Sequence, residues 1–258
     1  MTPTTIETAA QWLFAARREG RPVARLPESL RPADCASAHA IQRRVAELLA
    51  APIGGWKCSV GSPEREPLAP IYVATISRSS PCAVPTRNGQ ARIEPEVAFV
   101  LGRDLPPRAV PYSASEVVAA VSEIRLVLEL LGSRIDDPGP IPFVESLGDG
   151  LGNHGLFVGP CLPGDPRQGP ETFALSIATP TQTLLERVGV HPDGHPLRPL
   201  VWLANWMGTG GQWPEGLTQG QIVTTGSFAG AIEVPVDVPL AITFGAFGRI
   251  DVTLSGND

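Results

Sequence analysis

Three glutamates stand in segments that the sequence predicts to be strands. In IEPEVAFVLG, Glu94 and Glu96 are two residues apart, so they would share one strand face with Pro95 opposite. Glu129 lies in the apolar run LVLELL, where an unpaired carboxylate is costly. Carboxylate oxygens suit magnesium, manganese or calcium better than zinc. Together the three side chains would form a metal site with positions left for water and a chelating substrate, as a Lewis-acid enzyme needs.

Each glutamate also has a plainer interpretation. The E-x-E pattern is common, and Pro95 fits an acidic strand at the edge of a sheet. Glu129 could instead be neutralised by an ion pair with Arg125 or Arg134. The spacing alone does not decide between these interpretations.

The segment GGWKCSV contains Lys57, the one lysine in a chain whose lysines and arginines total 20. A guanidinium stays charged and binds bidentately, whereas an amine is compact and can lose its proton when desolvated. Near a metal-bound acid, Lys57 could hold a substrate carboxylate or move protons as a general acid and base. The alternative is a residual lysine on the surface, since lysine is rarely fully buried.

Length, charge and cysteine usage exclude several classes of protein. The 258 residues fit one large domain, or a small domain attached to a larger one. A net charge of −6 argues against nucleic acid as the main partner. We find no apolar run of membrane-spanning length, no secretory signal and no CxxC pair among the four cysteines. We therefore expect a cytoplasmic protein with reduced thiols and no membrane association.

The predicted elements change in character along the chain. Capping and periodicity predict helices over residues 4–20 and from about 32 to 51, which would form a helical lobe over 1–54. Residues 55–258 are expected to be mainly strands, arranged as a barrel or rolled sandwich in an α+β protein. Helices are predicted to interrupt them at 113–124 and 196–208.

A glycine-rich stretch, GDGLGNHG, offers Asp149, Asn153 and His154 as polar groups beside a backbone that a ligand could approach closely. The alternative is an ordinary turn. The sequence contains no G-x-S-x-G elbow, P-loop, H-E-x-x-H or dinucleotide-binding G-x-G-x-x-G motif, so nucleotide binding has no support.

The order of these segments resembles a known family. GWK, EPEVAFVLGRDL, LELLGSRI, the glycine-rich turn before FVG, and TGSFAG follow one another as in the 2-keto-4-pentenoate hydratase and 4-oxalocrotonate decarboxylase family, within the fumarylacetoacetate hydrolase superfamily. The resemblance covers nearly the whole chain. It implies a helical lobe followed by a mixed β-roll, in a homo-oligomer that can associate with a pathway enzyme.

The resemblance also implies roles for individual residues. It assigns magnesium or manganese to Glu94, Glu96 and Glu129, and an active-site role to Lys57. Substrate contacts are implied at four further positions: Ser133, Arg134, Asp149 and Ser227.

The chain departs from the family pattern at three places. The G-L-T-S that follows the family's lysine is here Ser59–Ser62. An Asp-Tyr-Gly that supplies a catalytic aspartate in many hydratases corresponds to Ala69–Tyr72, which contains no carboxylate. The family's A-D-N-A-S turn appears as Gly148–Gly152, which keeps Asp149 but not the asparagine. These changes put the standard substrate in question more than the metal site.

The expected activity is that of a metal-dependent lyase acting on an unsaturated 2-oxo acid in aromatic or related catabolism. Addition of water to a substrate of the 2-hydroxypenta-2,4-dienoate type is the leading interpretation, and decarboxylation of the 4-oxalocrotonate type is the nearest alternative.

The sequence also leaves a hydrolase and a non-catalytic protein open. Hydrolysis of a carbon–carbon bond in an acylpyruvate usually needs a histidine base, for which the chain offers His39, His154, His191 and His195. A non-catalytic homologue would bind a 2-oxo acid without converting it, or serve as a partner subunit.

Overall fold

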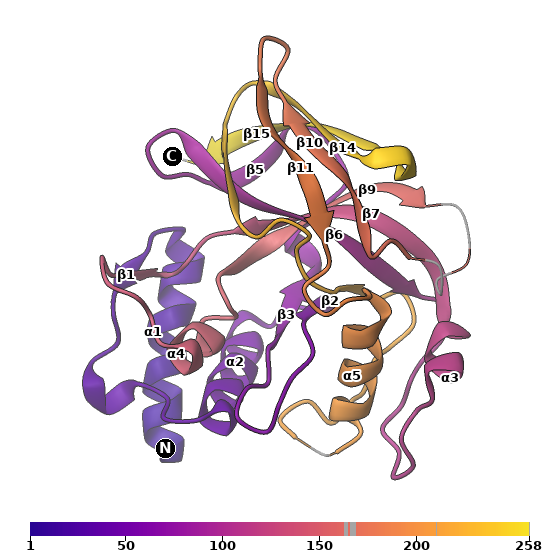
Figure 1. Ribbon diagram of the computed structural model, residues 1–258. Helices are drawn as coiled ribbons and strands as arrows, with labels where there is room; N and C mark the ends of the chain where they lie inside the picture. Colours follow the sequence, from indigo (N-terminus) through magenta and orange to yellow (C-terminus); the bar gives the residue numbers. More distant parts are fainter. Residues whose placement is uncertain (163–164, 166–168, 210, 258) are drawn as a thin grey trace.

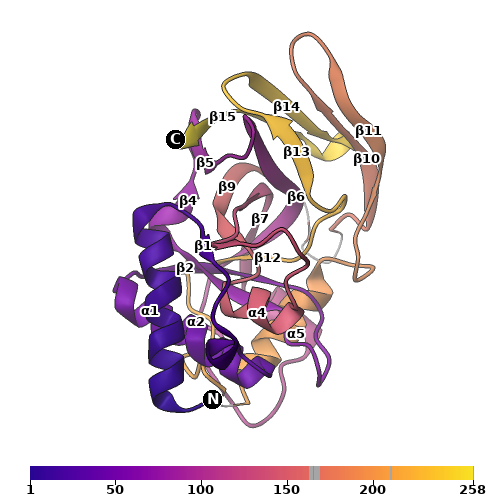
Figure 2. The same ribbon diagram turned by 90° about the vertical axis from the view of Figure 1, so that its left-hand side faces the viewer.

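The computed structural model describes residues 1–162, 165, 169–209 and 211–257. Helices α1, α2 and α4 gather at one end of the molecule, and the sheet that contains β10, β11, β14 and β15 lies at the other (Figures 1 and 2). A larger sheet lies between these two ends. No helix within the described ranges is long and apolar enough to cross a membrane.

The helices are α1 (Pro3–Glu19), α2 (Cys35–Leu49), α3 (Ala114–Val118), α4 (Phe143–Gly148) and α5 (Leu197–Met207), with short 3-10 turns η1 (Glu28–Leu30), η2 (Val73–Thr75) and η4 (Gly245–Phe247). The strands of the large sheet are β2 (Ile53–Cys58), β3 (Leu68–Tyr72), β4 (Ile76–Ser77), β6 (Gln90–Leu101), β7 (Val121–Leu131), β9 (Asn153–Leu162), β12 (Ile222–Thr224) and β13 (Ile232–Pro235). The remaining strands are β1 (Val23–Ala24), β5 (Cys82–Pro85), β8 (Ile135–Asp136), β10 (Thr172–Ala178), β11 (Thr183–Val190), β14 (Pro239–Phe244) and β15 (Arg249–Asn257).

The large sheet has the order β3-β2-β12-β6-β7-β9-β4, and β13 also pairs with β6. The smaller sheet has the order β11-β10-β14-β15-β5, and β1 pairs with β8. Within the large sheet, β6 and β7 form a long antiparallel pair, whereas β2 and β12 run parallel. These few helices and curled sheets confirm the predicted α+β fold class.

The N-terminal helices form where the sequence predicts them, but the predicted capping box at Thr4–Glu7 is wrong, because α1 already begins at Pro3. The Thr2 side chain accepts a hydrogen bond from the Thr5 amide at the start of α1, and Gly20 ends the helix in a left-handed conformation. Asp34 caps α2 through the Ser37 amide. The buried faces of both helices form a core cluster of their own: Ala9, Ala10, Leu13, Leu26, Ile41, Val45 and Ile135. A domain boundary at residue 54 stays a prediction.

Two elements differ from the sequence-based predictions. The helix expected over 113–124 ends at Val118, because residues from Val121 onward pair with β6 as the start of β7. Here strand pairing overrides a helical pattern. The six-residue helix α4 was not predicted, since its sequence is too short to show a helical period. By contrast, α5 begins after Pro196 as expected.

Candidate metal centre

The antiparallel pairing of β6 with β7 brings the three glutamates together. Glu94 lies directly opposite Glu129 in the register, and Glu96 follows on the same face of β6. One carboxylate oxygen from each residue lies within 4.8 Å of the others. Glu96 and Glu129 are buried, at 2% and 0% exposure. Because β6 lies between β12 and β7, the interpretation of an acidic edge strand is wrong.

Pro95 is accommodated by an interruption along one side of β6. This side pairs with β13 up to Ile93 and with β12 from Ala98 onward. In the interval, the Phe228 amide donates to the Pro95 carbonyl at 3.2 Å. Proline has no N–H to offer a neighbouring strand, so this interval suits it. The loop between β12 and β13 thereby passes beside the glutamates.

This loop holds the Glu96 carboxylate. Oε2 of Glu96 accepts from the Gly226 amide at 2.9 Å and from the Thr224 hydroxyl. Burial raises the pKa of Glu96 to about 8, with further contributions from the charges of Glu129 and Glu94. The pKa of Glu94 is also raised, first by burial and then by Glu129. The cluster therefore resists holding three negative charges by itself.

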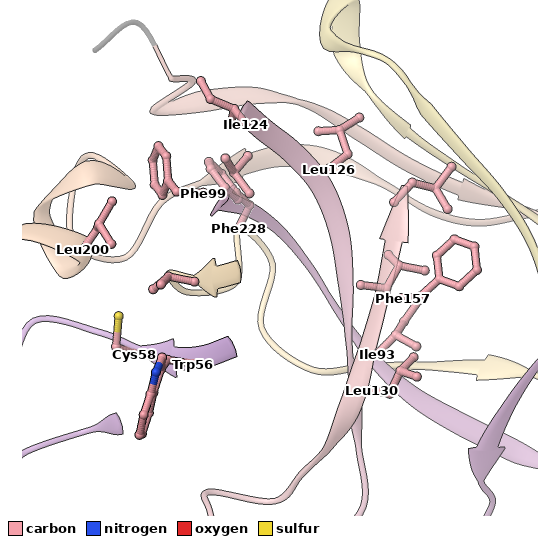
Figure 3. Packing of buried hydrophobic residues seen from close by; sticks show 14 of the residues in the cluster. Trp56, Cys58, Ile93, Phe99, Ile124, Leu126, Leu130, Phe157, Leu200 and Phe228 are labelled. Carbon is pink, nitrogen blue, oxygen red and sulfur yellow. The ribbon is translucent and has the colours of Figure 1, made fainter. Parts of the chain in front are cut away.

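Lys57 supplies the nearest positive charge. Its Nζ donates to Glu129 Oε1 at 2.6 Å and lies 3.4 Å from the Leu151 carbonyl. Its neighbours Trp56 and Cys58 belong to the buried apolar core (Figure 3). Burial lowers the pKa of Lys57, but the charges of Glu129 and Glu94 outweigh burial and raise it overall. The amine is therefore protonated at neutral pH.

Glu129 does not form the ion pair with Arg125 or Arg134 that was the alternative to a metal site. Arg125 pairs with Glu123 at 2.5 Å, and Arg134 pairs with Asp149 at 2.6 Å. Glu129 is neutralised by the amine instead.

The free oxygen of Glu129 fits a bound cation. Asn153 Nδ2 donates to the same Oε1 atom at 2.8 Å. Oε2 is buried and, among the described residues, has no hydrogen-bond partner. An unsatisfied buried carboxylate oxygen beside two other carboxylates is what a hard divalent cation would satisfy. The donor set fits magnesium or manganese, and the acidic cluster could bind a divalent metal.

The structure places Arg134 and Asp149 in a supporting position. Arg134 is 5% exposed, and its guanidinium donates to Asp149 Oδ1 at 2.6 Å and to the Asn153 carbonyl at 2.6 Å. The Arg134 backbone amide donates to Asp149 Oδ2 at 2.9 Å. These contacts fix the glycine-rich turn that carries Asn153. Arg134 does not line the pocket beside the glutamates, so substrate contact by it stays a prediction.

Ser133 and Asp149 line a second hollow of about 370 Å³, which also includes Lys57, Glu94 and Arg92. The Ser133 hydroxyl donates to the Ile135 carbonyl at 3.0 Å. Contact of Ser133 and Asp149 with substrate stays a prediction, and this hollow is where it would occur.

A pocket of about 480 Å³ opens in front of the glutamates. Its lining includes the three glutamates, Lys57, and residues from several loops: Cys58, Ser59, Arg65, Pro67, Ile141, Phe143, Ser146, Leu151, Gly226 and Ser227. Ser227 therefore lies in the pocket, where the resemblance put it. None of the four histidines, all within the described ranges, is part of this lining.

Sequence reasoning missed two polar partners of the cluster. Thr224 reaches Glu96 because β12 lies between β2 and β6, and Asn153 reaches Glu129 because β9 pairs with β7. Asn153 was recognised only as a polar group of the turn. Neither contact has a local sequence signal, since both depend on strand order.

Comparisons with known proteins find relatives that match most of the chain. It is 28% identical to the 2-keto-4-pentenoate hydratase of Paraburkholderia xenovorans, with 92% of this chain and 91% of that protein covered. It is 27% identical to 2-keto-4-pentenoate hydratase 1 of Dechloromonas aromatica, with 95% of both chains covered. No family model matches the sequence.

The solved structure of 4-oxalocrotonate decarboxylase from Pseudomonas putida G7 has the same fold. The form complexed with calcium and acetate gives a TM-score of 0.78, covers 98% of both chains and is 16% identical. The form complexed with magnesium and adipate gives a TM-score of 0.77.

The chain is therefore similar over most of its length to 2-keto-4-pentenoate hydratases, and it shares its fold with 4-oxalocrotonate decarboxylase. The stretch Ala69–Tyr72, which the resemblance matches to the family's Asp-Tyr-Gly, lies in β3, where Ala69 is opposite Lys57 in the register. Tyr72 is buried, and the Arg17 guanidinium lies 5.6 Å from its ring centroid. β3 thus offers no carboxylate beside the lysine.

Proposed function

We propose that this protein is a divalent-metal-dependent lyase that acts on an unsaturated 2-oxo acid. The observation that carries the proposal is the triad of Glu94, Glu96 and Glu129 beside a protonated Lys57 in one pocket. Water addition to a 2-hydroxypenta-2,4-dienoate type of substrate is the leading reaction, as in the hydratases that the chain resembles over most of its length.

Glu94, Glu96 and Glu129 would hold the cation, which would act as a Lewis acid on the carboxylate and keto oxygens of the substrate. The Lys57 amine lies within hydrogen-bond distance of Glu129 Oε1. It would therefore lie beside a 2-oxo acid bound to the cation. It can pair with the substrate carboxylate or transfer a proton to and from the carbon chain. Asn153 fixes Glu129 while this happens.

Decarboxylation is the second candidate, favoured by one observation. Among the described residues that line the main pocket, Lys57 is the one basic amine, and no carboxylate lies there outside the triad. Hydration needs a group to activate water and another to protonate carbon. Loss of carbon dioxide needs only protonation of carbon, which one amine can supply.

Acylpyruvate hydrolysis has less support, because no histidine lines the pocket in the described part of the chain. Homo-oligomerisation, association with a pathway enzyme and a cytoplasmic location stay predictions from the sequence, and a non-catalytic role stays open.

The test is the ultraviolet decay of 2-hydroxypenta-2,4-dienoate and of 4-oxalocrotonate, each with magnesium and then with a chelator. We expect magnesium-dependent loss of at least one substrate above its spontaneous rate. Lys57→Arg keeps the charge but should lower kcat by about 100-fold or more, because a guanidinium does not exchange protons near neutral pH.

Circular dichroism of the variant serves as the folding control. Undiminished activity in Lys57→Arg would contradict the role of the amine. Magnesium-dependent oxalate binding without turnover of either substrate would favour the non-catalytic homologue.

A further inference from the structure

The loop between β2 and β3, residues 59–67, forms one wall of the main pocket. Its ends are joined by a hydrogen bond from the Ser59 amide to the Pro67 carbonyl at 3.1 Å. Ser62 and Arg65 exchange backbone hydrogen bonds of 2.8 and 3.1 Å at its tip. The Val60 amide also donates to Asp193 at 3.0 Å. The loop is therefore a hydrogen-bonded turn that fixes the backbone position of Arg65.

The Arg65 guanidinium is oriented by an aromatic ring. It lies 4.2 Å from the centroid of Phe143, and both residues line the main pocket with the glutamate triad. Stacking of this kind leaves the N–H groups at the edge of the guanidinium free to bind an anion.

The carboxylates beside Arg65 in the sequence have other partners. Glu64 accepts from the Ser62 hydroxyl at 3.0 Å, and Glu66 lies 3.3 Å from His39 Nε2. Among the described residues, no carboxylate lies within ion-pair distance of Arg65. Arg65 is thus an exposed cation in the pocket wall that no carboxylate of the described residues neutralises.

We propose that Arg65 binds the distal carboxylate of the substrate, so that the pocket selects 2-oxo dicarboxylic acids over 2-oxo monocarboxylic acids of the same length. This inference rests on the proposed function as a metal-dependent lyase of 2-oxo acids, because the 2-oxo acid end must lie at the triad. It favours the second candidate substrate, 4-oxalocrotonate, over 2-hydroxypenta-2,4-dienoate, which has no distal carboxylate. Arg65 is then a substrate-binding residue that determines specificity.

Arg92 is the other arginine that could bind a distal carboxylate, but it has acidic neighbours of its own. It lines the smaller hollow, two residues from Glu94 on the same strand, and lies opposite Glu233 in the pairing of β6 with β13. The positive charge of Arg92 already acts on Glu94, where it opposes the rise in the pKa caused by burial and by Glu129. The two glutamates that flank Arg65 contact Ser62 and His39 instead.

The experiment is calorimetric titration of the magnesium-loaded protein with 2-oxoadipate and with 2-oxohexanoate, which differ only in the distal carboxylate. We expect the wild-type protein to bind 2-oxoadipate about tenfold more tightly, as for one charge-assisted contact. Arg65→Gln should remove this preference and leave the affinity for 2-oxohexanoate unchanged. Arg65→Lys should keep part of it, since an ammonium cannot bind the carboxylate bidentately.

Arg87→Gln is the matched control, because Arg87 lies on the exposed turn between β5 and β6 and outside both pockets. It should keep the full preference. A preference that survives in Arg65→Gln but disappears in Arg92→Gln would overturn the proposal. Equal, magnesium-dependent affinities of the wild-type protein would overturn it while the proposed function stands. No magnesium-dependent binding of either acid would overturn both.

Discussion

The two oxygens of Glu129 are treated differently by the protein. Oε1 accepts from both Lys57 and Asn153, whereas the buried Oε2 has no partner among the described residues. Oε1 is thus held by two hydrogen bonds, and Oε2 is available to a cation. At Glu96, Oε2 accepts from Gly226 and Thr224. The protein orients its ligands before a cation arrives, which lowers the cost of ordering them.

Magnesium affinity should rise with pH up to about 8, because Glu96 has a pKa of about 8 in the cation-free protein. Below that pH its carboxyl holds a proton that binding must release, and above it the proton is already gone. We expect up to about tenfold tighter binding per pH unit below the pKa. Calorimetry in two buffers of different ionisation enthalpy measures the released proton directly.

Glu96→Gln should bind magnesium weakly and without this slope. An affinity of the wild-type protein that is constant between pH 6 and 8 would contradict the role of Glu96.

At the scale of elements, β2 positions the amine. It lies between β3 and β12, and Lys57 is level with Thr224 in the parallel pairing. The approach of the two strands depends on Gly55, where an added Cβ would lie 2.1 Å from the Ile222 carbonyl oxygen. A backbone atom cannot move aside as a flexible side chain can, so the strands would have to separate.

Gly55→Ala should therefore destabilise the protein by about 3 kcal/mol and lower activity by shifting Lys57 from Glu129. Urea unfolding followed by tryptophan fluorescence measures the stability. Gly148→Ala is the matched control, since its nearest contact would be an ordinary 3.7 Å. Equal stability of the two variants would show that β2 and β12 tolerate separation.

The sequence predicts elements and faces better than contacts between distant segments. Strand alternation placed Glu94 and Glu96 on one face, and an apolar run marked Glu129 as a buried carboxylate. Alternation cannot reveal that β12 and β9 lie beside these strands, so Thr224 and Asn153 were not assigned. Substrate contact by Arg134 stays a prediction, and its burial against Asp149 was not foreseen because it depends on the turn that precedes β9.

At the scale of the whole molecule, the site unites stretches that are far apart in the sequence. Its polar groups come from β2, β6, β7, β9 and β12, all within the large sheet. Such a site cannot persist in the unfolded chain. A cation bound there consequently favours the folded state of the whole sheet.

Magnesium should therefore raise the thermal unfolding midpoint, by an amount that corresponds to about 2.7 kcal/mol at 100 times the dissociation constant. Glu94→Gln should remove most of this shift. Glu233→Gln is the control, because Glu233 is exposed on the neighbouring strand β13 and should leave the shift intact. Differential scanning calorimetry with and without chelator gives the measurement, and a shift that survives in Glu94→Gln would place the cation elsewhere.

Because Lys57 is the one lysine of the chain, reagents that modify amines can label the pocket selectively. Reagents that modify amines meet one lysine side chain and the chain's own α-amino group. Reductive methylation adds little bulk and preserves the positive charge. The mass of the intact protein would thus report directly on whether the pocket is occupied, without any substrate or knowledge of the reaction.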